Sequence, residues 1–162
     1  MKIQCITHDH TVEIPGATYE GMVLDHQELH RALLNKVHAP RASFRHANLR
    51  GAFMADAVFD GSDFTAANIV TAFLDRSSLV GCCLQDCVAF SCFFMRADLR
   101  GADLTGAQVH GAEFNGAQLQ GARLLCNSLE YATFDGAVYD AHTVWPAGFN
   151  PTAAGARLLA DS

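Results

Sequence analysis

The chain has 162 residues, a mass of 17.4 kDa and a formal net charge of −6 at pH 7. This length fits a single domain, no apolar run is long enough to span a membrane, and the start lacks a signal-peptide pattern, so we expect a cytoplasmic protein. The acidic balance disfavours direct nucleic-acid binding, because a phosphate-binding surface needs positive charge.

The first 21 residues predict a hairpin that caps the rest of the chain. Two short stretches, residues 2–6 and 11–14, have the composition of strands. The turn between them contains His8, Asp9 and His10.

Residues 22–41 allow two interpretations. Around and within this segment, apolar residues recur every five positions, at Tyr19, Leu24, Leu29, Leu34 and Ala39. After residue 41 the same five-residue spacing continues without exception. The spacing therefore favours an additional coil of that repeat over residues 22–41. The alternative is an amphipathic helix that begins at an Asp25 N-cap and ends at Val37.

The two interpretations differ in where they place two histidines. A helix would pair His26 with His30 at the i, i+4 spacing of metal ligands, whereas a coil would separate them. Together with His8 and His10 they form the only metal site that we consider, and we prefer a solvated, histidine-rich cap without metal.

From Ala42 to Ala141 the sequence divides into twenty five-residue units without an insertion. Every central residue is apolar; the twenty are Phe44, Leu49, Met54, Phe59, Phe64, Ile69, Leu74, Leu79, Leu84, Ala89, Phe94, Leu99, Leu104, Val109, Phe114, Leu119, Leu124, Leu129, Phe134 and Tyr139. Two positions earlier stands a small residue, Ala in fourteen units and Asn127 in one. Neither a helix nor a strand has a period of five, so the chain must turn a corner in each unit.

Three of these units carry a recognisable motif. Residues 97–101 (ADLRG), 102–106 (ADLTG) and 47–51 (ANLRG) resemble the A(D/N)LxG pattern of the pentapeptide-repeat family. The resemblance implies an all-β fold, a right-handed quadrilateral parallel β-helix with one unit per side and five to six coils. Members of the family do different things on this scaffold, so the fold alone leaves the function open.

We therefore expect a hairpin cap over residues 1–21, the β-helix over 22–141 and a C-terminal cap over 142–162. Asn150 followed by Pro151 is a good helix start, so Pro151 to Ala160 is expected to form a short helix. Its Leu158 and Leu159 would cover the last coil, together with Trp145 and Phe149.

The cysteines follow the repeat. Cys82, Cys87 and Cys92 occupy the small inward position, whereas Cys83 and Cys126 fall on outward positions and are expected to be free thiols, which favours a reducing compartment. There is no CxxC pair, so a zinc site is not expected, and no cofactor is implied.

An outward column of aromatic residues is the candidate functional site. Phe53, Phe73 and Phe93 lie twenty residues apart and should stack on one side of the β-helix. The surface that we expect around them also includes Met95 and, on the adjacent side, Val70, Val88 and Phe90. Such a patch is seldom left uncovered in a soluble monomer, so it predicts a protein partner or a homodimer. The alternative is that the exposure is tolerated locally, or that a register shift near Ala89 turns Phe90 inward.

No catalytic constellation emerges from the sequence, and we expect a non-enzymatic protein-interaction scaffold. The alternative comes from the resemblance: some acidic pentapeptide-repeat proteins, including quinolone-resistance (Qnr) proteins, resemble B-DNA and bind DNA gyrase. Residues 42–141 carry a net charge of −5, but a cysteine separates Asp63 from Asp103, and Arg76 and Arg96 interrupt another column.

Overall fold

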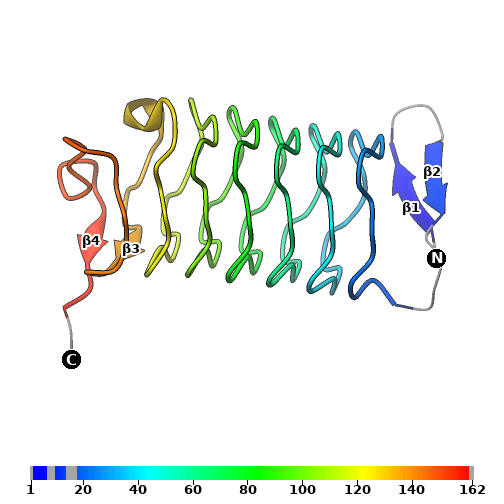
Figure 1. Cartoon of the computed structure of the whole chain (residues 1–162), viewed down its shortest axis with the longest axis horizontal. Helices are drawn as coiled ribbons and strands as arrows, with labels where there is room; N and C mark the ends of the chain where they lie inside the picture. The colour runs from blue at the N-terminus through cyan, green and yellow to red at the C-terminus, as the bar shows by residue number, and fades with distance from the viewer. Residues whose placement is uncertain (1, 7–9, 14–17, 161–162) are drawn as a thin grey trace.

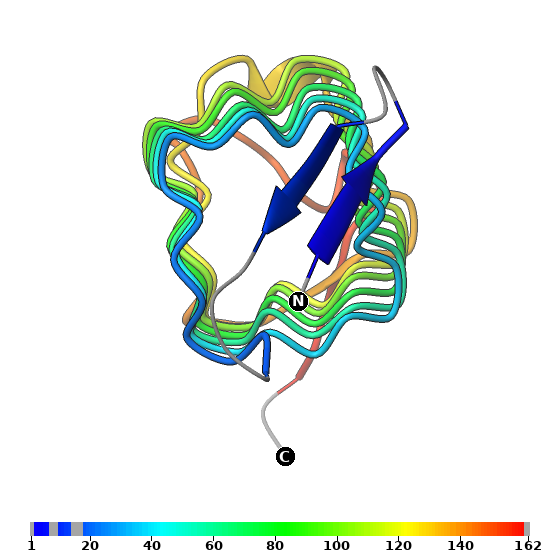
Figure 2. The same cartoon turned by 90° about the vertical axis from the view of Figure 1, so that its right-hand side faces the viewer.

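The computed structural model describes residues 2–6, 10–13 and 18–160, which form a rod of stacked turns of chain (Figure 1). Viewed along the rod, the turns superpose in a four-sided outline (Figure 2). Parallel bridges join residues twenty apart, from Val23 with Ser43 to Asp103 with Arg123. The β-helix expected from the five-residue repeat is therefore the fold of this chain.

The backbone repeats the same conformation at each corner. From Leu24 to Leu119, the residue two places after each central residue has a positive φ, such as 57° at Asp56 and 66° at Gly61. The small residue that follows closes the corner, as when the N–H of Ala47 donates to the carbonyl of Phe44 at 3.0 Å. Between corners the coils hydrogen-bond to one another, so the backbone polar groups are satisfied along the rod.

The interior is filled by the central and small residues. Phe94, Phe114 and Phe134 are fully buried, and their rings stack with centroids 5.0 and 5.1 Å apart. The inward positions expected for Cys82, Cys87 and Cys92 are confirmed, since each is at most 1% exposed. The rod has a packed core rather than a pore.

An antiparallel hairpin lies across the N-terminal end of the rod. It consists of β1 (Lys2–Cys5) and β2 (His10–Glu13), and the side chains of Ile3 and Val12 are buried beneath it. It joins the coils where the N–H of Leu33 donates to the carbonyl of Gln4 at 2.8 Å. Of the expected turn, His8 and Asp9 lie outside the described residues, as does the side chain of His10.

Residues 22–41 form a coil that bridges to residues 43–58. The alternative helix from Asp25 to Val37 is wrong, because Leu24, Leu29 and Leu34 all point into the continuous core. His26 stacks on His46, with ring centroids 5.0 Å apart, instead of pairing with His30 along a helix.

The repeat slips by one residue near the C-terminal end. Asn127, expected on the small inward position, is exposed and bridges to Gln108, nineteen residues earlier. Cys126, expected to point outward, is partly buried, and its thiol donates to the carbonyl of Leu104 at 3.4 Å. The short 3₁₀ helix η1 (Leu129–Tyr131) comes next, and Thr133 is back in register with Glu113. The twenty units are therefore not uninterrupted.

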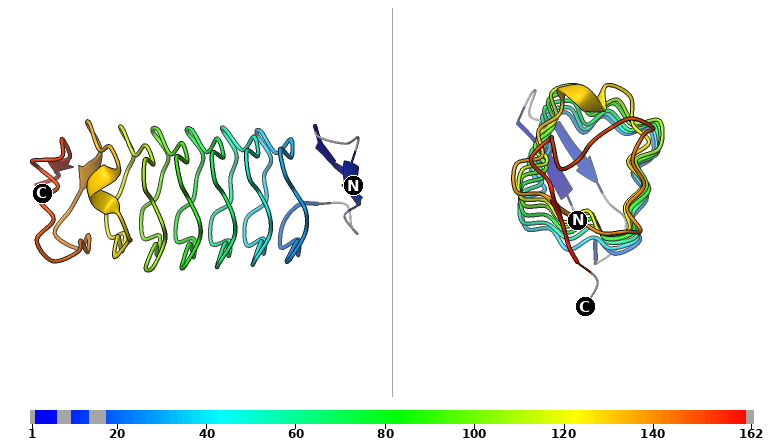
Figure 3. Two further views of the ribbon diagram at one scale, coloured as in Figure 1. Left: turned by 90° about the horizontal axis from the view of Figure 1, so that it is seen from above. Right: turned by 90° about the vertical axis from the view of Figure 1, so that its left-hand side faces the viewer.

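The C-terminal cap continues the β-helix instead of forming the expected helix. The residues after Asn150 make a turn, and β4 (Arg157–Leu158) pairs in parallel with β3 (Val138–Tyr139) (Figure 3). Gly155 ends the turn with a φ of 93°, and a Cβ there would lie 3.2 Å from Asp135 Cα. A helix through residue 160 would lose this close approach and the pairing of β4.

The residues that cover the end also differ from expectation. Leu158 is 60% exposed and Leu159 is 52% exposed, whereas Ala156 is buried. Trp145 and Phe149 do cover the core: both rings pack edge-on against Phe134, with centroids 5.5 and 5.7 Å away.

Candidate protein-interaction surface

The aromatic column, formed by Phe53, Phe73 and Phe93, stands on one side of the rod. Consecutive bridges place the three residues directly above one another. Their rings are nearly parallel, with centroids 5.3 Å apart between Phe53 and Phe73 and 5.0 Å apart between Phe73 and Phe93. The column is thus a rigid stack on a backbone that fixes its spacing.

The column is half-buried rather than fully exposed, because each ring covers part of the next. It is also longer than the sequence analysis predicted. Leu33 bridges to Phe53 and is 41% exposed, so it extends the apolar column by one coil. The twenty-residue spacing identifies Leu33 as soon as residues 22–41 are recognised as a coil.

Two further apolar side chains stand at the corners of the same side. Phe90, at the corner before Phe93, is 38% exposed, and Met95, at the corner after it, is 37% exposed. The register shift that would have turned Phe90 inward is absent, since Ala89 is fully buried.

The remaining two predicted members lie further from the column. Val70 precedes Phe90 by one coil at the same corner. Val88 belongs to the adjacent side, where it bridges to Asn68 and Gln108. Both valines are half-buried. The structure therefore brings Val70, Phe90 and Met95 to the side or corners of the column and leaves Val88 among polar neighbours.

Beside Met95, the corner is hollowed into an open groove of about 470 Å³. Its lining is Asp75, Arg76, Met95, Arg96, Asn115, Gly116 and Asp135. One carboxylate oxygen of Asp75 is buried without a hydrogen-bond partner among the described residues, and desolvation raises the pKa of this group. Arg76 donates two hydrogen bonds, of 2.7 and 2.8 Å, to Asp56. Arg96 has no acidic partner within ion-pair distance in the described part of the chain.

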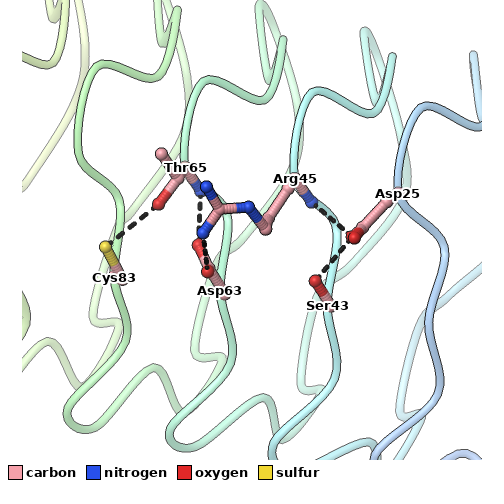
Figure 4. Close-up of polar contacts among 6 residues, drawn as sticks. All are labelled: Asp25, Ser43, Arg45, Asp63, Thr65 and Cys83. Carbon is pink, nitrogen blue, oxygen red and sulfur yellow. Dashed lines mark hydrogen bonds and ion pairs between the residues drawn. The ribbon is translucent and has the colours of Figure 1, made fainter.

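The opposite side of the rod has a different character, because its polar groups pair with one another (Figure 4). Asp25 accepts hydrogen bonds from the Ser43 hydroxyl at 2.5 Å and from the Arg45 N–H at 3.0 Å. The Arg45 guanidinium donates to Asp63 at 2.8 Å, and Asp63 accepts from the N–H of Thr65. This side pairs its own charges, whereas on the side of the aromatic column the described segments offer no charged partner to Asp75 or Arg96 within hydrogen-bond or ion-pair distance.

Four of the six cysteines are poorly suited to a reactive site. Burial raises the pKa of the Cys82 and Cys126 thiols to about 12 and raises the pKa of Cys87 and Cys92 as well. These thiols remain protonated at neutral pH and are poor nucleophiles or metal ligands. Across residues 2–6, 10–13 and 18–160, no three His, Cys, Asp or Glu residues are grouped to hold a metal ion.

The acidic residues alternate with other residues along the ladders. Asp63 bridges to Cys83, which bridges to Asp103, and the next residue of this ladder is Arg123. The Nε atom of Arg123 lies 3.8 Å from the Oδ2 atom of Asp103. The interruption seen in the sequence is thus present in three dimensions.

The family model described as pentapeptide repeats (8 copies) matches this chain over residues 28–65, 40–76, 92–125 and 102–138. The chain belongs to the pentapeptide-repeat family. A comparison with curated proteins gave no match.

Solved structures of other pentapeptide-repeat proteins are similar to this one. Rfr23 from the cyanobacterium Cyanothece 51142 has 23% identity and a TM-score of 0.53, over 80% of this chain and 88% of Rfr23. The protein alr5209 from Nostoc PCC 7120 has 30% identity and a TM-score of 0.38, over 72% of this chain and 84% of its own. QnrB1, a plasmid-mediated fluoroquinolone resistance protein, has 15% identity and a TM-score of 0.41, over 88% of this chain and 93% of its own. The likeness to Rfr23 supports the fold alone.

The described segments contain no helix with the length and hydropathy that a membrane crossing requires.

Proposed function

We propose that this pentapeptide-repeat protein is a non-enzymatic scaffold that binds another protein chain through the aromatic column. The observation that carries the proposal is the stack of Phe53, Phe73 and Phe93 on one side of a rigid rod. Aromatic side chains with fixed positions are efficient anchors, because little conformational entropy is lost when a partner covers them.

The surroundings of the column support the same function. Leu33, Phe90 and Met95 add apolar surface around the rings, each being 37–41% exposed. Charged residues stand beyond them at the corners, so the surface has an apolar centre and a polar rim. This arrangement is typical of protein interfaces.

The test is a triple substitution, Phe53→Ser, Phe73→Ser and Phe93→Ser. The inward residues are untouched, so we expect the β-sheet circular dichroism spectrum and a cooperative unfolding transition to persist. Association, measured by light scattering of the purified protein and by affinity capture from host cells, should be lost.

A matched control replaces half-buried apolar residues on another side, with Val58→Ser and Val80→Ser. The control should associate like the unmodified protein. If the triple variant folds and associates as strongly as this control, the binding surface is elsewhere and the proposal is wrong.

We do not propose the alternative, DNA mimicry toward gyrase. A DNA mimic needs continuous columns of negative charge, and the ladder of Asp63 and Asp103 is interrupted by Cys83 and ends at Arg123.

A further inference from the structure

Charge is distributed unevenly along the rod. Residues 31–50 include five basic residues and no acidic residue, whereas residues 51–160 include eleven acidic and five basic residues. The same polarity is present on the side of the aromatic column and its corners. There, the N-terminal end carries Arg31, Lys36 and Arg50, and the C-terminal end carries Glu113, Glu130 and Asp135.

A surface with one positive and one negative end is complementary to a reversed copy of itself. We propose that the aromatic column binds a second copy of this chain, with the two rods antiparallel and the two-fold axis between Phe73 and Phe93. This inference rests on the proposed function, since it names the partner of the same surface.

The symmetry fixes which residues meet. A two-fold axis that lies in the interface and crosses the rods at right angles reverses the order of the coils but keeps each corner opposite the same corner. The coil of residues 62–81 then faces 82–101, 42–61 faces 102–121, and 22–41 faces 122–141. At the centre, Phe73 of each copy meets Phe93 of the other.

Opposite charges meet along one corner of this arrangement. Asp75 faces Arg96 of the second copy near the axis, and Lys36 faces Asp135 at the far end. In the single chain, Asp75, Arg96, Lys36 and Asp135 all lack a charged partner within ion-pair distance among the described residues, and one carboxylate oxygen of Asp75 is buried without a hydrogen bond. Arg76 stands at the same corner, but its two hydrogen bonds to Asp56 neutralise it within the chain.

The other corner and the side itself show the same complementarity. Arg31 faces Glu130 of the second copy, and Arg50 lies at the level of Glu113. Each of these contacts occurs twice, because the interface is symmetric. The aromatic column supplies the apolar centre, and the charged pairs at the rim set the register.

Other arrangements of two copies bring like charges together. An axis through Phe73 would place Asp75 against Asp75 of the second copy. Parallel rods would place Arg31 near Lys36 at one end and Glu130 near Asp135 at the other. The antiparallel register between Phe73 and Phe93 avoids these repulsions.

The experiment measures self-association by sedimentation equilibrium at low ionic strength. The unmodified protein should form a dimer. Asp75→Arg sets two pairs of arginines against each other, and Arg96→Asp sets two pairs of aspartates against each other, so each variant alone should dissociate at least about tenfold more readily. An equal mixture of the two variants restores both opposite-charge contacts in the heterodimer and should dimerise like the unmodified protein.

The mixture separates contacts between copies from effects within one chain, because a folding defect in one variant is not repaired by adding the other. Matched controls on the opposite side are Arg123→Asp and Asp103→Arg, whose side chains lie 3.8 Å apart within one chain. These controls should leave the dissociation constant unchanged.

Each outcome decides a separate point. A protein that stays monomeric at every concentration overturns this inference but not the proposed function, which the triple serine variant still tests by capture of another protein. A dimer that survives the triple serine substitution overturns the use of this surface for self-association. A dimer that the triple substitution abolishes, but whose charge variants are not rescued by mixing, overturns the proposed register.

Discussion

The coils between residues 22 and 124 and the segment from 125 to 160 close the same core in different ways. From residue 42 to 124, every side contributes one central and one small residue, and each bridge within the coils joins residues twenty apart. In the last segment the separations become nineteen at Asn127 and twenty-one at Val144. A regular repeat can therefore extend the core indefinitely but cannot close its end.

The end is closed by groups that the repeat lacks. Rings of Trp145 and Phe149 pack edge-on against Phe134, and Ala156 fills the place of a small inward residue. At the other end, the hairpin of β1 and β2 does the same with Ile3 and Val12. Caps of this kind prevent the open edges of the terminal coils from pairing with other chains.

The largest expected effect tests the regular coils. Leu104→Ala should lower the free energy of unfolding by roughly 2 to 5 kcal/mol, because it leaves a cavity among residues that cannot collapse around it. Chemical denaturation followed by circular dichroism measures the loss. Gln118→Ala changes an exposed residue of the same coil and should alter the free energy of unfolding by no more than about 0.5 kcal/mol. Similar losses for both variants would contradict the inward position of Leu104.

A second prediction tests the closure. Trp145→Ala should cost about 2 to 3 kcal/mol, less than a fully buried tryptophan, because the ring is only half-buried. Since each coil contacts only its neighbours, amide hydrogen exchange should accelerate mainly over residues 122–160. Uniform acceleration along the rod would show that the end and the coils unfold together.

Trp145→Phe is the matched control for this prediction. The indole N–H of Trp145 is buried without a hydrogen-bond partner among the residues that the structure describes. Phenylalanine keeps an aromatic ring and removes this unsatisfied donor, so the cost should be much smaller than that of Trp145→Ala.

The smallest expected effect compares corners in the two regions. Gly106 and Gly136 have φ values of 77° and 68°, so alanine should cost about 1 kcal/mol at either site. A Cβ on Gly106 would also clash with Asp86 Oδ1, whereas nothing lies within 4 Å of a Cβ on Gly136. Because the Asp86 side chain can move aside, Gly106→Ala should cost only about 0.5 kcal/mol more.

A double-mutant cycle checks the source of that difference by thermal unfolding. In an Asp86→Ala background, Gly106→Ala should cost the same as Gly136→Ala, because the obstructing carboxylate is gone. If the two glycines differ as much as before, the contact with Asp86 is not the cause.

The sequence was sufficient for the regular part because its period of five has one structural consequence. Once the chain turns a corner in every unit, the inward positions of Leu104 and Cys82 and the alignment of Phe53, Phe73 and Phe93 are determined. Local signals did not compete with the repeat, since each corner accepts glycine or a longer residue at positive φ.

The remaining features depend on contacts between coils that no local pattern records. Asn127 and Cys126 changed places because the corner after Leu124 is one residue shorter, and the sequence marks that corner only by a polar Asn127 where the other units have Ala, Ser or Cys. Asn150 does begin a turn, as a helix N-cap would. The chain does not continue as a helix, because β4 pairs with β3 instead. Likewise, the isolation of Asp75 and Arg96 depends on where the neighbouring coils place the other charged groups, which the sequence pattern does not record.

The twenty-residue spacing also determines how insertions and deletions would alter the surface of the aromatic column. Adding or removing a whole coil lengthens or shortens the stack and leaves every side facing as before. Adding a single five-residue unit between Phe73 and Phe93 would instead rotate all later residues by a quarter turn and divide the aromatic column between two sides, while the core still repeats. A duplication during evolution can thus erase or create a recognition surface without a single change in the residues that hold the protein together.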